Sequence, residues 1–557
     1  MKIEVNGQTI NLSKTDFLSQ GGEGSVYVRG NTAYKIYHSQ DKMIPIAKIN
    51  ELSGLDLQRI IKPHYIIYNN NIPIGYTMRY VENTYPLCKV FTKAFKQRNN
   101  LSFENVFKLA KTIQDGVEHI HNKRILIVDL NELNFLISEH FDDVFFIDVD
   151  SYQTKSFPAT AIMESIRDRH SKKFSELSDW FSWAVVTFQM LIGIHPYKGR
   201  HSSITDLEER MLKNISVFNK DVSVPKICES FDLIPEVYRN WYKAIFEDGK
   251  RLPPPTSMQA VAFIAPIIKS IIGSNLFDIE ELFKANEDII SVFYGQNRYV
   301  TTTSKIICNN GNHLSFPINS HLAVTTKDEY FVWPDNGKII IQNKLTGNKI
   351  EIIGSNKLMS RDGRVYIQEY DSVCELAIKE TTNNKFMCFI NVVANILPQA
   401  TQMFNGVILQ NILGTWFASI PNATGSCIQT QLKELNGYRI IDAKSEKNVL
   451  MVIGFANGSY KKFIYCFDSN FDKYDLCTEE NINNLNVNFT VLDNNICVHL
   501  NDKDELELFA GRCGQSNQKK VIKDSILGQD MRLVSQGTLC QFVRGDSLYS
   551  IKVKQKP

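Results

Sequence analysis

The first half of the sequence holds several residues whose types and spacing could carry out chemistry on phosphate. The earliest is the glycine-rich run SQGGEGSVY, from Ser19 to Tyr27. Glycines let backbone N–H groups approach a phosphate closely, but they are equally common in ordinary turns. The run by itself does not distinguish a phosphate-binding loop from a turn, so the interpretation depends on the residues that follow.

A lysine on a strand-like segment comes next. Lys35 lies in AYKIY, between Tyr34 and Ile36. A lysine directed between two sheets is unfavourable unless it meets an anion. The alternative is a lysine at the surface of an edge strand.

Three further polar residues follow at strand and loop positions. In HIHNKRILIVDLNELNFLI, Asp129 and Asn134 are spaced D-x-x-x-x-N in a loop between a helix and an apolar strand. A loop carboxylate can accept a hydroxyl proton, and a carboxamide oxygen can bind Mg²⁺. The apolar strand of VFFIDVDSYQ ends at Asp148, where a carboxylate could hold a metal bound to phosphates.

The elements that must position these residues change character along the chain. Short β-like runs open the sequence, and two helical segments follow. FENVFKLAKTIQDGVEHIH has apolar residues at helical spacing, and SELSDWFSWAVVTFQMLIG is apolar nearly all round, which predicts a buried helix. We expect a small β-rich lobe followed by a larger helical lobe over residues 1–270.

The second half of the sequence has a different pattern of residues. Short strand-like segments alternate with Gly, Asn and Asp turns, a pattern typical of a sandwich, barrel or propeller. Its length of roughly 260 residues favours a β-propeller of about five to seven blades. We therefore predict a helical connector over residues 271–290 and an all-β domain over residues 291–557, in which Trp333 and Trp416 belong to the core.

Composition excludes several classes of function. The 557 residues carry a formal charge of +2, which implies neither a nucleic-acid surface nor a polybasic membrane face. The 11 cysteines form no CxxC pair, which argues against a zinc site or a disulfide scaffold. The N-terminal segment has no signal-peptide core, and no apolar run reaches transmembrane length. We expect a cytoplasmic protein.

In this order, the glycine run, strand lysine, D-x-x-x-x-N loop and strand-end aspartate resemble the Ser/Thr protein kinase fold, which is bilobal and α+β. The resemblance covers the whole first half. More narrowly, DLNELNFLI with FIDVDSYQ is similar to an atypical bacterial branch of protein kinase-like proteins, often described with helix-hairpin-helix domains. Here the β-rich half takes the place of such a domain.

The resemblance implies that ATP and Mg²⁺ are cofactors. Lys35 would hold the α- and β-phosphates, Asp129 would accept the proton of the substrate hydroxyl, and Asn134 and Asp148 would bind Mg²⁺. It assigns ATP binding to Gly21, Gly22, Gly24, Val26, Lys35, Met78, Tyr80 and Val81.

Three more residues match the kinase pattern by their position. Asp179 corresponds to the helix aspartate that anchors the catalytic loop from below. Glu164 and Arg251 correspond to a buried acid–arginine pair. The alternative for Arg251 is an exposed position at a helix end.

The sequence departs from the family at three places. Ile127-Val128 replaces the usual His-Arg before the catalytic aspartate. Asp150 stands where a glycine is expected; it could add a second carboxylate near the metal or cap a turn, and we favour the cap. Glu51 is the only acid in the expected αC helix, and it either pairs with Lys35 or is solvated.

These features lead to three functional hypotheses. The first is an ATP-dependent Ser/Thr protein kinase acting on an unidentified protein substrate, with a partner-binding β domain. The second is a pseudokinase or scaffold that binds nucleotide only. The third is a small-molecule kinase, since such enzymes share the D-x-x-x-x-N loop. Neither nucleic acid nor a membrane is expected as a partner.

Overall fold

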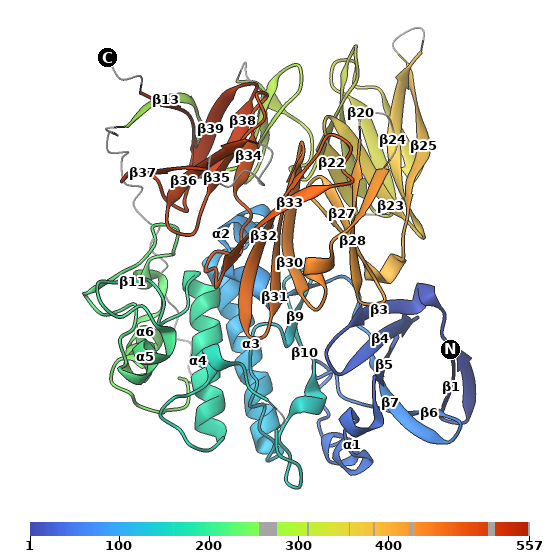
Figure 1. The fold of residues 1–557 in the computed structure, drawn as a ribbon, viewed down its shortest axis with the longest axis vertical. Coiled ribbons are helices and arrows are strands. Elements are labelled where there is room, and N and C mark those ends of the chain that lie inside the picture. The colour runs from blue at the N-terminus through green and yellow to red at the C-terminus, as the bar shows by residue number, and fades with distance from the viewer. Residues whose placement is uncertain are drawn as a thin grey trace. The chain divides into compact units, whose positions relative to one another are not determined.

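The computed structural model describes residues 1–159, 161–255, 274, 276–308, 311–355, 357–381, 385–422, 427–510 and 519–554. The chain divides into two compact units. The first comprises Met1–Ser13 and Gly21–Ile268, and the second comprises Lys14–Gln20 and Lys269–Pro557. Figure 1 shows the elements of both in the colours of the chain order.

The chain opens with a seven-stranded sheet in the order β2-β1-β6-β7-β5-β4-β3. Its strands are β1 (Lys2–Val5), β2 (Gln8–Asn11), β3 (Phe17–Gln20), β4 (Gly24–Arg29), β5 (Thr32–Tyr37), β6 (Ile66–Asn69) and β7 (Ile72–Arg79). Strands β4 and β5 form a hairpin in which Val26 lies directly opposite Lys35. Since directly opposed residues of an antiparallel pair share a face, Val26 and Lys35 project to the same side of the sheet.

Helices dominate the rest of the first unit. α3 (Phe103–Asn122) begins with a capping box at Ser102, and α4 (Glu176–Ile192) ends at Gly193, which has a left-handed φ of 87°. The two helices pack against each other and lie side by side in Figure 1. α4 is buried along nearly its whole length, as its apolar sequence predicts. The shorter helices are α1 (Ile46–Leu52), α2 (Lys93–Arg98), α5 (Leu207–Leu212) and α6 (Glu236–Phe246).

Two small sheets complete the described part of this unit. β8 (Thr84–Pro86), β9 (Phe135–Ser138) and β10 (Val144–Phe146) form one in the order β10-β9-β8. β11 (Arg200–His201) and β12 (Val222–Ser223) form the other. The hairpin β9–β10 matters for chemistry because it brings the residue before β9 next to the residues after β10.

The described part of the second unit contains seven four-stranded antiparallel sheets. Six use strands that are consecutive in the chain, and β22–β25 and β30–β33 are two such groups in Figure 1. Their strands are β14 (Ile289–Tyr294), β15 (Arg298–Thr302), β16 (Ile306–Cys308), β17 (His313–Leu314); β18 (His321–Val324), β19 (Glu329–Asp335), β20 (Lys338–Asn343), β21 (Lys349–Ile353); β22 (Leu358–Arg361), β23 (Arg364–Glu369), β24 (Ser372–Glu380), β25 (Phe386–Asn395); β26 (Thr401–Phe404), β27 (Val407–Ile412), β28 (Thr415–Pro421), β29 (Cys427–Gln431); β30 (Arg439–Glu446), β31 (Val449–Ala456), β32 (Ser459–Phe467), β33 (Tyr474–Glu480); β34 (Phe489–Val491), β35 (Ile496–Leu500), β36 (Glu505–Ala510) and β37 (Lys520–Lys523).

The seventh sheet joins the two ends of this β-rich region. β13 (Phe277–Lys284) pairs with the last strand, β40 (Ser547–Val553), followed by β39 (Leu539–Arg544) and β38 (Arg532–Gln536). The helical connector predicted over 271–290 is therefore wrong from Phe277 onward, and 271–273 and 275 lie outside the described residues. The segment FDIEELFK is rich in helix-forming residues, but pairing with a strand at the far end of the chain overrides that local preference.

The cores of these sheets are apolar, as the strand pattern predicted. Trp416 is only 4% exposed and packs in a cluster drawn from β27, β28, β30, β31 and β32. Trp333 is partly buried against Phe331 and its neighbours. Within the described residues, we find no helix with the length and apolarity needed to cross a bilayer.

Candidate active site

The glycine-rich loop is a tight turn between β3 and β4. Its ends meet where the Gly21 amide donates to the Gly24 carbonyl at 2.8 Å. A Cβ at Gly24 would lie 2.5 Å from the Ile36 carbonyl oxygen, so glycine is required there by the close approach of β5. A Cβ at Gly22 would meet no atom within 4 Å, so packing with the protein does not explain glycine at that position.

The Lys35 ammonium contacts two carboxylates from the segment after β10. It lies 2.6 Å from Asp150 Oδ2 and 3.4 Å from Asp148 Oδ1, and the lysine side chain is 12% exposed. The alternative pairing with Glu51 is wrong. Glu51 instead accepts a hydrogen bond from the Ser156 amide at 3.2 Å.

Asp150 is a buried ligand of Lys35, so its interpretation as a turn cap is wrong. It lies in a single 3₁₀ turn (Val149–Ser151), and its side chain is 3% exposed. The Tyr37 hydroxyl donates to the same oxygen at 2.7 Å. Burial alone would raise the pKa of Asp150, but the Lys35 charge and hydrogen bonds from Lys35, Tyr37 and Tyr76 hold that pKa below its ordinary value.

Asp148 remains open to solvent in the same cluster. It adopts a left-handed backbone with φ of 59°, a conformation that non-glycine residues adopt rarely and that Asn, Asp and His adopt most often among them. Its recessed position and the negative charge of Asp150 raise the pKa of Asp148 to about 6, against the attraction of Lys35. The side chain is nevertheless 44% exposed, which leaves it accessible to a cation.

Asp129 and Asn134 contact each other within the loop that precedes β9. The Asn134 carboxamide NH₂ donates to the Asp129 carbonyl at 2.9 Å and to its carboxylate at 3.3 Å. The Met163 amide donates to the other carboxylate oxygen at 2.8 Å, and burial raises the pKa of Asp129. The Ile147 amide binds the Asn134 carbonyl at 2.9 Å, which places Asn134 beside the end of β10 that leads to Asp148.

The start of this loop is held by a fully buried carboxylate on α4. Asp179 accepts hydrogen bonds from the Ile127 and Val128 amides at 2.8 and 2.9 Å, and it contacts His121 Nε2 at 2.9 Å. Val128 has φ of 63°, a strained value for a β-branched residue. Asp179 therefore holds the backbone immediately before Asp129 in a conformation that it would not adopt alone.

The residues assigned to the adenine base follow β7. Met78 lies opposite Ala33 and packs near Tyr76. The Tyr80 amide donates a hydrogen bond to the Asn31 carbonyl at 2.9 Å. The Val81 amide makes no hydrogen bond within the described ranges, so it is available to meet a base.

The predicted pair between Glu164 and Arg251 does not form. Arg251 makes two 2.6 Å hydrogen bonds to Asp168, whose side chain is 3% exposed. Glu164 is 60% exposed and pairs with Arg167 and Arg169. The segment ESIRDR contains two acids four residues apart, and no local pattern indicates which one turns inward.

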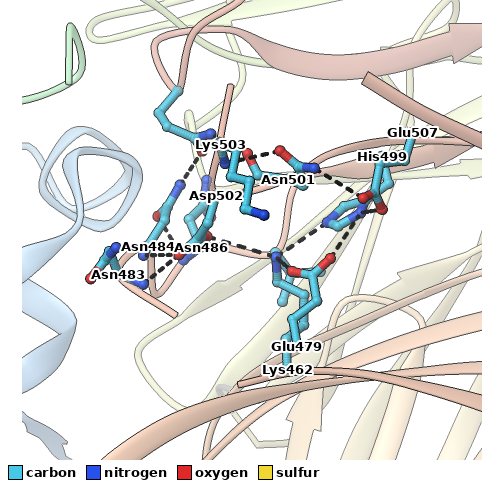
Figure 2. Close-up of polar contacts among 12 residues, drawn as sticks. Lys462, Glu479, Asn483, Asn484, Asn486, His499, Asn501, Asp502, Lys503 and Glu507 are labelled. Carbon is cyan, nitrogen blue, oxygen red and sulfur yellow. Dashed lines mark hydrogen bonds and ion pairs between the residues drawn. The ribbon is translucent and has the colours of Figure 1, made fainter. Parts of the chain in front are cut away.

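A second cluster of charged groups lies in the β-rich unit, where β32, β33, β35 and β36 meet (Figure 2). Glu479, His499 and Glu507 have the spacing of metal ligands. However, Lys462 Nζ lies 3.0 Å from Glu479 and 3.2 Å from His499 Nε2, and His499 Nδ1 lies 3.1 Å from Glu507. The lysine ammonium already supplies the positive charge that a metal would bring.

The similarity to known proteins covers part of the chain. No protein-family model matches the sequence. The probable serine/threonine-protein kinase samkA of Dictyostelium discoideum is 26% identical over 221 residues, covering 36% of this chain and 34% of that protein. A second probable serine/threonine-protein kinase of that organism is 24% identical over 117 residues, covering 20% of this chain and 9% of its own length. These distant similarities indicate a kinase-like relationship.

Proposed function

We propose that the first unit is a bilobal protein kinase-like domain that transfers the γ-phosphate of ATP to a Ser/Thr-type hydroxyl of a protein. The observation that carries this proposal is the contact of Lys35 with Asp148, 3.4 Å apart, beside the hydrogen-bonded pair Asp129–Asn134. Phosphoryl transfer needs a phosphate-binding cation, metal-binding oxygens and a group that orients the hydroxyl. All three kinds of group are available in this cluster.

The donor set fits Mg²⁺ and a polyphosphate. The accessible Asp148 carboxylate and the Asn134 carboxamide oxygen are hard oxygen ligands of the kind that Mg²⁺ prefers. A bound Mg²⁺ would neutralise negative charge on the phosphates. Lys35 binds and orients the phosphates, and Gly21, Gly22 and Val26 form the wall above them.

Asp129 is the residue proposed to orient the acceptor hydroxyl and take its proton. Burial raises the pKa of this carboxyl, which makes it a better proton acceptor than an exposed aspartate. Its contact with the Met163 amide fixes one oxygen and leaves Oδ2, which also meets Asn134, as the oxygen for a substrate.

For the second unit we propose a seven-bladed β-propeller that binds a protein partner. The seven four-stranded sheets of its described residues, and the pairing of β13 with β40, which joins the first strand to the last sheet, support this architecture. The outer strand β25 carries four exposed apolar side chains, which support a role in protein contact: Met387, Phe389, Ile390 and Val392.

The test of the proposed transfer is the intact mass of the purified chain after incubation with Mg-ATP, beside an Asp129→Asn variant. Added phosphate in the parent alone supports a working kinase, and peptide mapping then identifies the acceptor. Added phosphate in both proteins would refute the role of Asp129.

A nucleotide-binding pseudokinase is the second candidate. The contact of Met163 with Asp129 favours it, because that amide occupies an oxygen of the proposed catalytic residue. It predicts ATP binding without transfer to the chain itself, peptides or small alcohols. Transfer to a small alcohol but not to peptides would instead support a small-molecule kinase.

A further inference from the structure

The helix expected to supply a carboxylate to Lys35 supplies a second lysine instead. Lys48 lies on α1, and its residue is only 2% exposed although it is charged. It lies four residues before Leu52 on the same helix, and Leu52 is fully buried. This spacing puts Lys48 on the inward face of the helix.

The ammonium of Lys48 has no hydrogen-bonding or ion-pair partner in the ranges that the structure describes. The charged groups that act on it are Asp150, Asp148 and Lys35 of the candidate site, and Glu23 of the glycine-rich run. Burial lowers the pKa of Lys48, and the three carboxylates only partly offset this effect. A buried cation without a direct partner is unfavourable unless an anion completes its surroundings.

The way in which Lys35 is held explains why position 48 on α1 can carry a lysine in place of an acid. Asp150 binds Lys35 at 2.6 Å, and helix α1 packs on the turn that carries Asp150. Because the carboxylate comes from this turn, no acid is needed on α1. The same helix face can then present a positive charge to the site.

Building on the proposed function, we propose that Lys48 is a second phosphate-binding lysine, which contacts the polyphosphate of a nucleotide together with Lys35. Asp150 acts as the positioning residue that holds Lys35 in place. Two carboxylates, Asp148 and Asp150, face two lysines, so the site can gain a metal ion and a polyphosphate together without a large net charge.

The experiment compares Lys48→Met with the parent and with Lys108→Met, an exposed lysine on α3. Isothermal titration calorimetry measures binding of Mg-ATP, Mg-ADP and adenosine by the full chain. We expect Lys48→Met to weaken ATP binding about 10- to 100-fold, the range for a charge-assisted hydrogen bond, and to leave adenosine binding unchanged. Lys108→Met should match the parent for all three.

Thermal unfolding of the same variants separates a binding role from a structural one. Without ligand, Lys48→Met should unfold at the same or a higher temperature than the parent, because it removes an unpartnered buried charge. With Mg-ATP, its stabilisation by ligand should be smaller than that of the parent. A lower unfolding temperature without ligand, or equal losses of ATP and adenosine binding, would overturn the proposal.

The positioning role of Asp150 has its own readout. Asp150→Asn should weaken ATP binding in the parent but have no further effect in a Lys35→Met background, because the two residues act as one unit. Additive effects would reject that role. A parent that binds neither ATP nor ADP would overturn the proposed function as well, whereas undiminished ATP binding by Lys48→Met would overturn this inference alone.

Discussion

Each unit of this protein contains a buried group of charged residues built around a lysine, and the two groups differ in how completely they are satisfied. In the β-rich unit, Lys462 is 2% exposed and contacts Glu479 and His499 directly. In the first unit, Lys35 is equally well bound to Asp150, but Asp148 remains 44% exposed. Lys48 in that unit has no direct partner among the described residues.

The difference separates a structural cluster from one suited to ligands. A buried charge network that is fully satisfied stabilises a particular packing and offers nothing to a ligand. A network with an accessible carboxylate, an unpartnered ammonium and a strained backbone is of the kind found at functional sites. Four substitutions or conditions test this contrast.

The largest effect is expected for Asp148→Asn. Removing the accessible carboxylate should reduce phosphate incorporation from Mg-ATP by about 100-fold or more, the scale of one lost electrostatic contact in a transition state. The unfolding temperature should not fall, because the change also removes repulsion with Asp150. Intact-mass kinetics and thermal unfolding measure both quantities. A destabilised but fully active variant would reverse the contrast between the clusters.

Lys462→Met should show the opposite behaviour. It leaves Glu479 without its cation and His499 Nε2 without its partner, although Glu507 keeps its ion pair with Lys519. The loss should destabilise the β-rich unit by about 3–5 kcal/mol. Hydrogen–deuterium exchange should increase in peptides covering β32 and β35. ATP binding should stay at the parental value, and a selective loss of ATP binding would show that this cluster is not merely structural.

Arg251→Lys tests the buried ion pair between Arg251 and Asp168 in the first unit. Lysine cannot reproduce the two parallel hydrogen bonds to Asp168, so a loss of about 1–3 kcal/mol in unfolding free energy is expected. Arg239→Lys is the matched control, because its partner Asp232 is 81% exposed and such surface pairs contribute about 0–1 kcal/mol. Urea unfolding compares the two, and equal effects would contradict the buried assignment.

The smallest effect is a dependence on pH in the β-rich cluster. Burial and then the Lys462 charge lower the pKa of His499 below its ordinary 6.5, against the pull of Glu507 and Glu479. The unfolded chain therefore binds a proton that the folded chain does not, and stability falls as pH drops below about 6.5, by at most about 1.4 kcal/mol per unit. Exchange in β35 between pH 7 and 5 measures this. His499→Gln should flatten the dependence, and an unchanged slope would exclude His499 as its source.

In the first unit, the elements that depend on the local spacing of apolar residues could be predicted from the sequence. Helices α3 and α4 formed where apolar spacing placed them, and Lys35 lies on a strand opposite Val26. Asp150 was wrongly interpreted as a turn cap and Lys48 was not singled out, although both residues left a signal. Lys48 interrupts an apolar helix face, and Asp150 repeats a carboxylate two residues after Asp148.

By itself, the sequence determined the residue types available for chemistry and their order along the chain. Only the tertiary structure decided which charges meet. Lys35 pairs with Asp150 across 115 positions and not with Glu51, and Arg251 pairs with Asp168 across 83 positions and not with Glu164. β13 likewise became a strand because β40 lies beside it. Local periodicity reports which face of an element is apolar, whereas the partner of a buried charge depends on contacts between distant segments that form only when the chain packs.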